Sequence, residues 1–197
     1  MPLHIAAAND NSELVELLLK HDANIDVTDI VGDTARHHAV GNYTPRVSSS
    51  RYLPDVVSLN NTKSVVDILL ENKADVNLVN SYGKTPMYTA ASRGLLDVVS
   101  KMLLVYGGNL NKGISPLVAA CCFQHVELVH LLLKHGANPD LTGMSCDSGS
   151  KNTLPLFIAV DKGNNDIAMS LLNAGANANA LNDEGKSIVC FAAETLD

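Results

Sequence analysis

One block of apolar residues recurs along the chain, and a polar turn follows each copy. The apolar positions of each copy cluster at helical spacing, which predicts a helix that is buried along one face. Small residues and an Asn- or Asp-bearing turn come next, as in residues 136–140 and 175–179. Residues of these types end helices and form turns. The blocks are 14–19, 65–70, 98–104, 128–133 and 167–172.

A second, shorter element precedes each block. Its clearest copies begin with Thr85-Pro86 and Ser115-Pro116. A Thr or Ser hydroxyl can accept from free N–H groups at the start of a helix, and Pro suits the first helical position, so a helix is predicted to begin there. Alanine pairs, such as Ala119-Ala120, make this helix thin enough for close approach by its neighbours. The copies are 2–7, 34–39, 85–90, 115–120 and 154–159, with a degenerate sixth at 187–192.

Together these segments resemble the ankyrin repeat, whose signature is T-P-L-H-x-A with a period of roughly 33 residues. The resemblance covers nearly the whole chain. It implies an all-α fold, an ankyrin-repeat solenoid of stacked helix-turn-helix repeats with β-turn fingers, about five repeats plus a partial sixth. We predict a single ankyrin-repeat domain over residues 1–197, with repeats at approximately 1–29, 30–80 (with an insertion at 41–60), 81–111, 112–150, 151–182 and a partial repeat at 183–197.

Two intervals between glycines depart from the period. Gly32 and Gly83 are 51 residues apart, and the excess falls in residues 41–60, where two prolines and a serine run show no helical period. A loop is predicted there. Gly83 and Gly113 are only 30 residues apart, which predicts a clipped finger. Neither end of the chain has the polar capping repeat that a solenoid needs, so we expect the chain to be part of a longer protein.

Charge and cysteine content narrow the classes of partner and compartment. Fourteen Lys and Arg against 21 Asp and Glu give a net charge of −7, which disfavours nucleic acid as a partner. No apolar run approaches the ~18–20 residues that span a bilayer, so no membrane contact by this segment is expected. The four cysteines form no C-x-x-C pair. We expect reduced thiols, a cytoplasmic or nuclear location, and a monomer within a longer chain.

No catalytic or cofactor motif occurs in the sequence. It contains no G-x-S-x-G, no G-x-x-x-x-G-K-[ST] and no H-E-x-x-H, so we predict no enzyme activity, no catalytic residue and no cofactor. We also predict no metal site, because the side chains of His37 and His38 diverge by ~100° on a helix. The resemblance assigns a structural role to His4 and His37, which occupy the histidine position of the signature.

The ankyrin resemblance places function on the concave face, which is formed by the fingers and the exposed ends of the first helices. We expect a protein-protein interaction scaffold whose partner presents an acidic segment with apolar anchors. The alternative is that the residues on this face are ordinary solvated surface residues without a binding role. Two other functions stay open: the cytoplasmic ankyrin region of a membrane channel or receptor, and the targeting arm of a larger enzyme such as a kinase or ubiquitin-ligase subunit. The predicted partner-binding residues are Tyr82, Lys84, Arg93, Lys112, Ile114, Phe123, Lys151, Asp161 and Lys162.

The resemblance also implies a possible modification at Asn77. Ankyrin-like fingers with Leu eight residues before an Asn in an Asp-Val-Asn context are substrates of an asparagine hydroxylase, and Leu69, Asp75-Val76 and Asn77 match that context. A final expectation concerns stability. Residues 1–78 carry two non-glycine helix ends and the insertion, so this part should open before residues 81–182.

Overall fold

The computed structural model of the chain describes residues 1–44, 63–143, 153–182 and 184–195. Within these ranges it contains eleven helices and, in place of extended strands, three isolated β-bridges. The helices form two compact units, Met1–Asp75 and Val76–Asp197. An all-α ankyrin architecture was predicted, and the helices confirm it.

The first unit contains two helical repeats. Its helices are α1 (Pro2–Ala8), α2 (Ser12–Lys20), α3 (Ala35–Asn42) and α4 (Val65–Glu71). Helix α1 packs on α2 and α3, and α4 packs on α2 and α3. A finger, residues 28–34, joins the two repeats and is closed by an antiparallel bridge between Thr28 and Thr34. The predicted insertion at 41–60 lies mostly outside the described residues.

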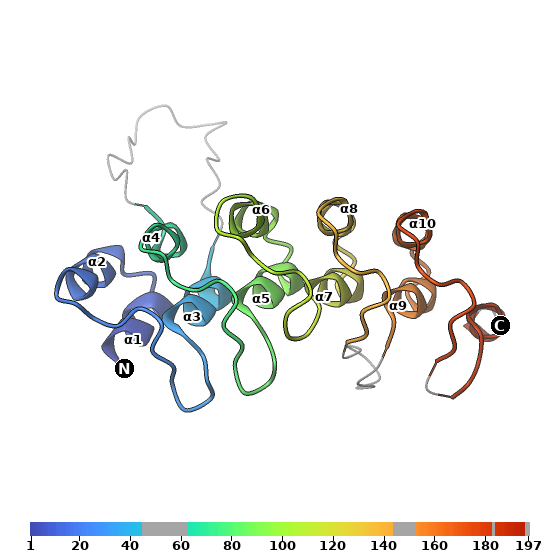
Figure 1. Cartoon of the computed structure of the whole chain (residues 1–197), viewed down its shortest axis with the longest axis horizontal. Coiled ribbons are helices and arrows are strands. Elements are labelled where there is room, and N and C mark those ends of the chain that lie inside the picture. The colour runs from blue at the N-terminus through green and yellow to red at the C-terminus, as the bar shows by residue number, and fades with distance from the viewer. Residues whose placement is uncertain (45–62, 144–152, 183, 196–197) are drawn as a thin grey trace, which may run out of the picture. The chain divides into compact units, whose positions relative to one another are not determined.

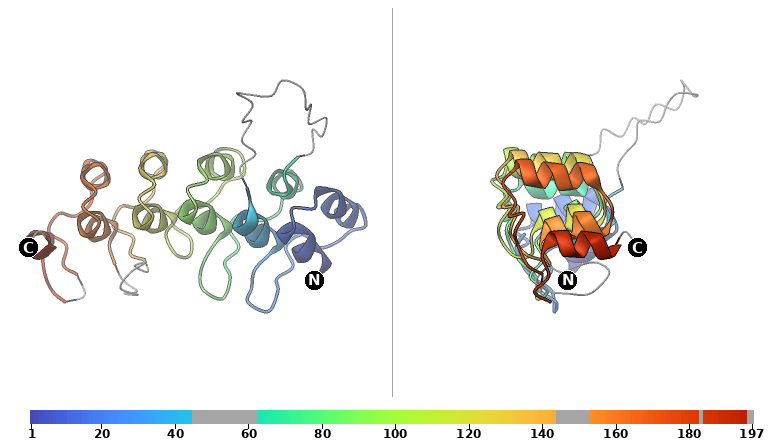
Figure 2. Two further views of the ribbon diagram at one scale, coloured as in Figure 1. Left: turned by 180° about the vertical axis from the view of Figure 1, so that it is seen from behind. Right: turned by 90° about the vertical axis from the view of Figure 1, so that its right-hand side faces the viewer.

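The second unit continues the same pattern over seven helices. Helices α5, α7 and α9 lie in one row, which α11 extends, and α6, α8 and α10 lie in a second row (Figure 1; seen from behind in Figure 2). We call the two rows inner and outer. The fingers lead into the inner helices. The bounds are α5 (Pro86–Ser92), α6 (Leu96–Leu104), α7 (Pro116–Cys122), α8 (Val126–Lys134), α9 (Pro155–Asp161), α10 (Asn165–Asn173) and α11 (Ile188–Thr195).

The helix ends follow most of the sequence-based expectations. Thr85 Oγ1 accepts from the Tyr88 N–H at 3.1 Å, as predicted for a capping hydroxyl. The helix predicted at Ser115-Pro116 is confirmed, because α7 begins at Pro116, but the Ser115 hydroxyl does not make the expected capping bond. Asp22 and Lys73 both have φ 60° where other repeats use glycine. A side chain is disfavoured in that left-handed conformation, so these two ends are strained.

Two histidines of the signature tie the finger to the helices. His37 Nδ1 accepts from the Thr34 N–H at 3.1 Å, and His4 Nε2 lies 3.0 Å from the main-chain oxygen of Asp33. Both side chains are buried. Their predicted structural role is therefore confirmed.

Asparagine and aspartate side chains link successive repeats. In the first unit, Asp26 Oδ1 accepts from the Asp75 N–H at 2.9 Å. The turns of the second unit repeat this bond from one repeat to the next, and each hydrogen bond satisfies a main-chain donor at the interface. The pairs there are Asn77 to Asn109 at 2.7 Å, Asn111 to Asn138 at 3.2 Å and Asp140 to Asn177 at 3.0 Å.

Arg36 lies in the core of the first unit. It occupies the position at which the signature has leucine, and its side chain is only 1% exposed. Its Nη2 donates to the main-chain oxygen of Leu69 at 3.1 Å, in the last turn of α4. A cation is favourable at the negative end of a helix, which offsets part of the cost of burying the guanidinium.

The cysteines differ from the sequence-based expectation. Cys121 and Cys190 are free, but Cys122 is disulfide-bonded, so the expectation of reduced thiols is wrong for Cys122. Cys122 is buried in α7 together with Cys121. The fourth cysteine, Cys146, lies outside the described residues.

Candidate functional site

The fingers of the second unit present four of the predicted partner-binding residues. Tyr82 and Lys84 lie on the finger before α5, and Asn80 fixes that finger because its Oδ1 accepts from the N–H groups of both, each at 3.0 Å. The Tyr82 side chain is 65% exposed. The Lys84 ammonium lies 5.1 Å from the centre of the Tyr88 ring, a distance at which cation and ring attract one another.

The next finger packs directly against the first. The Ile114 N–H donates to the main-chain oxygen of Gly83 at 2.8 Å. At Gly113, a Cβ would lie 2.4 Å from that same oxygen, so only glycine fits there. The clipped finger thereby places Ile114 beside Gly83, the residue that separates Tyr82 from Lys84 in the sequence. We call Tyr82, Lys84, Lys112 and Ile114 the finger group.

The other predicted residues lie where the inner helices end. Arg93, Phe123 and Lys162 are the C-terminal cap residues of α5, α7 and α9, and Asp161 is the last residue of α9. The Phe123 side chain is 52% exposed. We call Arg93, Phe123, Asp161 and Lys162 the cap group.

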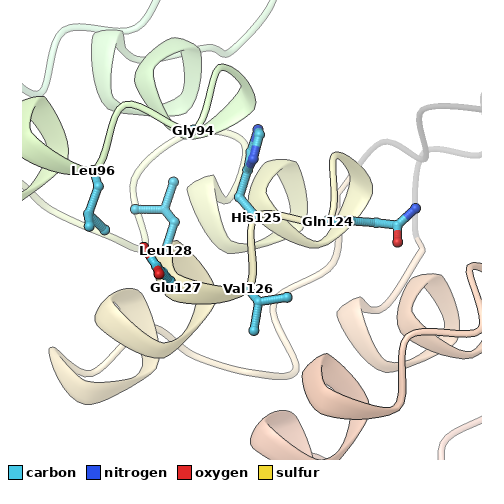
Figure 3. A pocket seen from close by; sticks show the side chains of 7 residues that line it. All are labelled: Gly94, Leu96, Gln124, His125, Val126, Glu127 and Leu128. Atoms are coloured by element: carbon cyan, nitrogen blue, oxygen red, sulfur yellow. The ribbon is translucent and has the colours of Figure 1, made fainter. Parts of the chain in front are cut away.

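His125 and a cavity adjoin the cap group. The Phe123 and His125 rings are stacked at 6.4 Å between centroids, and His125 Nε2 lies 3.2 Å from the main-chain oxygen of Ser92. Figure 3 shows the His125 ring against the turn at Gly94. The cavity beside it has a volume of ≈ 290 Å³. Its lining residues are Gly94, Leu96, Gln124, His125, Val126, Glu127 and Leu128 (Figure 3).

The predicted face is therefore two groups of residues at opposite ends of the inner helices. The finger group precedes the N-termini, and the cap group follows the C-termini. A helix of seven residues, such as α5, is about 10 Å long. Two places on one partner can contact both groups across that distance. Lys151 lies outside the described residues.

The finger group carries positive charge. Residues 79–84 and 111–114 include Lys84 and Lys112 but no Asp or Glu. Tyr88, under the Lys84 ammonium, is half-buried, and burial raises the pKa of its phenol. It therefore stays neutral at physiological pH. In the cap group, Arg93 and Lys162 outnumber the single acid Asp161.

Comparison with known protein families covers most of the chain. A family model of three consecutive ankyrin repeats matches residues 55–143. A model of the single ankyrin repeat matches residues 1–30 and 152–183. The chain belongs to the ankyrin repeat family.

Several curated ankyrin-containing proteins are similar to it. An ankyrin repeat and KH domain-containing protein of Caenorhabditis briggsae is 34% identical over 192 residues, which is 95% of this chain and 6% of that protein. The E3 ubiquitin-protein ligase hecd-1 of Caenorhabditis elegans is 33% identical over 131 residues, 65% of this chain and 5% of the ligase. The potassium channel AKT2/3 of Arabidopsis thaliana is 29% identical over 162 residues, 78% of this chain and 20% of the channel. The ankyrin chain thus spans a small part of each of these relatives.

The described helices are short. The longest have nine residues, and among the described segments none has the length and hydropathy needed to cross a membrane.

Asn77, the predicted modification site, lies in an inter-repeat turn. Its Oδ1 accepts from the Asn109 N–H at 2.7 Å, and its Nδ2 donates to the main-chain oxygen of Gly107 at 3.3 Å. Both ends of the amide are therefore used to join ankyrin repeats. Asn111 and Asp140 make the equivalent bond from their own repeats.

Sequence reasoning did not find the cavity or the link from His125 to Ser92. His125 precedes α8 as its N-terminal cap residue, a position at which the repeat pattern alone indicates a structural role. Phe123 and His125 are two residues apart in the sequence, and this proximity is a signal that could have indicated their contact. The contact of His125 with Gly94 joins residues 31 positions apart, and no local pattern predicts it.

Proposed function

We propose that this chain is a protein-protein interaction scaffold that binds a partner protein through the finger and cap groups of its second unit. The exposure of Tyr82 and Phe123 carries the proposal. Aromatic side chains bury a large apolar surface when they meet a partner, and Tyr is among the residues enriched in binding hot spots. Both stand on backbone held by hydrogen bonds, so little ordering is needed on binding.

The charges around these aromatics favour an acidic partner segment. Lys84 and Lys112 flank Tyr82, and Arg93 and Lys162 lie in the same row of helix ends as Phe123. Their charge is opposite to that of the chain as a whole, which is −7. An acidic segment is attracted locally, and this attraction weakens as salt rises. The cavity beside His125 is large enough to admit an apolar side chain, and we propose that it takes one of the partner's apolar anchors.

The scaffold can belong to proteins of several kinds. One relative is named as a potassium channel and another as a ubiquitin ligase. The same binding face would serve as the cytoplasmic ankyrin region of a channel or as the targeting arm of an enzyme. A stretch of ~20 apolar residues in the flanks of the full-length protein would favour the channel. A catalytic motif in those flanks would favour the enzyme.

Affinity capture with a matched control tests the proposal. Immobilised wild-type chain, a Tyr82→Ala/Phe123→Ala variant and a Leu104→Ala/Val105→Ala variant are compared in cell lysate by quantitative mass spectrometry. The control pair is equally exposed but lies at the end of outer helix α6. We expect partners that are retained by the wild type and the control and lost with the Tyr82/Phe123 variant. Partners that all three proteins retain equally would contradict the proposed face.

We also propose Asn77 as a hydroxylation site, on the basis of its sequence context alone. The chain is incubated with an asparagine hydroxylase that acts on ankyrin repeats, and its peptides are mapped by mass spectrometry. One added oxygen on Asn77 would support the assignment. An unmodified Asn77 peptide, with modification of a control ankyrin substrate in the same reaction, would refute it.

A further inference from the structure

Three side chains of the first unit converge at the base of its finger. Asp29 and Asp33 belong to the finger, and His38 belongs to α3. His38 Nε2 lies 2.9 Å from Asp29 Oδ2. One donor atom from each of the three residues lies within 4.8 Å of the other two, and all three side chains are partly exposed. Solvent and ions can therefore reach the cluster.

The turn of the finger does not require an acid at position 29. Asp29 Oδ1 accepts from the N–H groups of Val31 and Asp33, both at 2.9 Å. Asn80 and Asn182 make the same pair of bonds in the fingers of the second unit, at 2.9–3.0 Å. A neutral amide is thus sufficient for the turn.

The other two positions also differ between the fingers. Lysine stands at the Asp33 position in the fingers that begin at Asn80 and Asn182, as Lys84 and Lys186. In the repeat that follows Asn80, Thr89 stands at the His38 position. The two carboxylates and the imidazole are therefore an addition to the turn, and turn formation does not account for them.

The spacing of the His38 and Asp29 donor atoms suits a metal ion. Cis ligands of an octahedral ion with bonds of about 2.1 Å lie about 3.0 Å apart, close to the 2.9 Å between His38 Nε2 and Asp29 Oδ2. Imidazole with carboxylates favours first-row transition metals over Mg²⁺ and Ca²⁺.

We propose that Asp29, Asp33 and His38 bind a divalent first-row transition metal ion, for which Zn²⁺ is the probe. Asp29 keeps Oδ1 on the turn and supplies Oδ2, Asp33 supplies a carboxylate oxygen, and His38 supplies Nε2. The ion replaces the hydrogen bond between His38 and Asp29 and clamps the finger to α3. The proposal differs from the sequence-based expectation of no metal site, which rested on the adjacent pair His37 and His38 and did not consider the acids of the finger.

The buried side chain of His4 contacts two of the three proposed ligand residues. Its side chain is 4% exposed, and its ring meets the His38 ring edge-on at 5.5 Å. Through its bond to the main-chain oxygen of Asp33, it fixes the residue that carries one of the ligands. Groups that orient metal ligands in this way commonly change metal affinity by about 10–100-fold.

Isothermal titration calorimetry of the 197-residue chain with Zn²⁺ tests the proposal. All proteins carry Cys190→Ser, which removes an exposed thiol that would compete for zinc. Asp29→Asn and His38→Thr introduce the residue types found at the equivalent positions of the second unit, Asn80 and Thr89, so the turn should be preserved. Asp33→Asn removes the third ligand, and Asp22→Asn removes an acid elsewhere in the first unit as a control.

We expect one Zn²⁺ per chain, with affinity lowered at least about tenfold by each ligand substitution and unchanged by Asp22→Asn. The absorption spectrum of bound Co²⁺ should change with His38→Thr, since the imidazole is a ligand. Absence of stoichiometric zinc binding would overturn the proposal. Circular dichroism shows whether each variant is folded. If His38→Thr or Asp33→Asn bound Zn²⁺ as tightly as the wild type, the proposal would also be overturned, because that residue would not be a ligand.

Discussion

Gly94 offers a direct test of how the cap group is held in place. It follows the cap residue of α5 and has φ 68°. A Cβ built on it would lie 2.7 Å from Cε1 and Nδ1 of the His125 ring. In Gly94→Ala the ring must therefore move, and it loses both its bond to the Ser92 oxygen and its stacking on Phe123.

Gly163 is a matched control for this change. It occupies the same position after α9, has φ 64° and has nothing within 4 Å of a built Cβ. Alanine in a left-handed conformation costs roughly 1–2 kcal/mol at either position. The lost hydrogen bond adds about 1 kcal/mol at Gly94, and the lost stacking adds about 0.5–1.5 kcal/mol.

Gly94→Ala should therefore lower the free energy of unfolding by about 1.5–2.5 kcal/mol more than Gly163→Ala. Urea unfolding of both variants, followed by far-UV circular dichroism, measures the difference. Equal losses would refute the reasoning, because they would show that the His125 contacts contribute nothing to stability. Gln124, with φ 57° at the same position after α7, shows that a side chain is accepted there when no ring opposes it.

Four further predictions concern the two units and the cysteines. Lys73→Gly relieves a left-handed lysine and should raise the free energy of unfolding by about 1 kcal/mol; no gain in urea unfolding would show that this helix end is unstrained. Arg36→Leu restores the leucine of the signature and should raise the same free energy by about 1 kcal/mol or more, because it removes a buried guanidinium; a loss of that size would mean that its bond to α4 outweighs the desolvation. Native-state hydrogen exchange should show the first unit opening before the second, and uniform protection would contradict this. Burial raises the pKa of the Cys121 thiol to about 12, so at about pH 8 iodoacetamide should label exposed Cys190 and spare Cys121; equal labelling would show that α7 opens readily.

The sequence was sufficient to predict the fold because repetition identifies it. Five copies of the same two-helix pattern predicted the helices, and the signature histidines predicted the bonds of His4 and His37. The left-handed ends at Asp22 and Lys73 followed from the alignment of one repeat with the next. Arg36 was visible as a misfit to the signature, but its bond to the end of α4 depends on how the helices pack.

The site was less predictable because it depends on contacts between repeats. The ankyrin resemblance placed the partner-binding residues together on one concave face, whereas the length of each inner helix separates them into the finger and cap groups. Asp33 and His38 follow Asp29 by four and nine residues, and the three lie on a finger and on α3, so no single helical or strand period groups them. They meet only because the finger folds back, with the Asp29 N–H donating to the Asp33 oxygen at 2.9 Å.

Photocrosslinking tests the proposed binding face most directly. A photoreactive phenylalanine analogue replaces Tyr82, Phe123 or Leu104 in turn, and each protein is irradiated in cell lysate and analysed by mass spectrometry. The account predicts that the probes at positions 82 and 123 crosslink to the same partner protein, and that the probe at 104, on the outer row, does not. Crosslinking of that partner through position 104 alone would place binding on the opposite face and contradict the account.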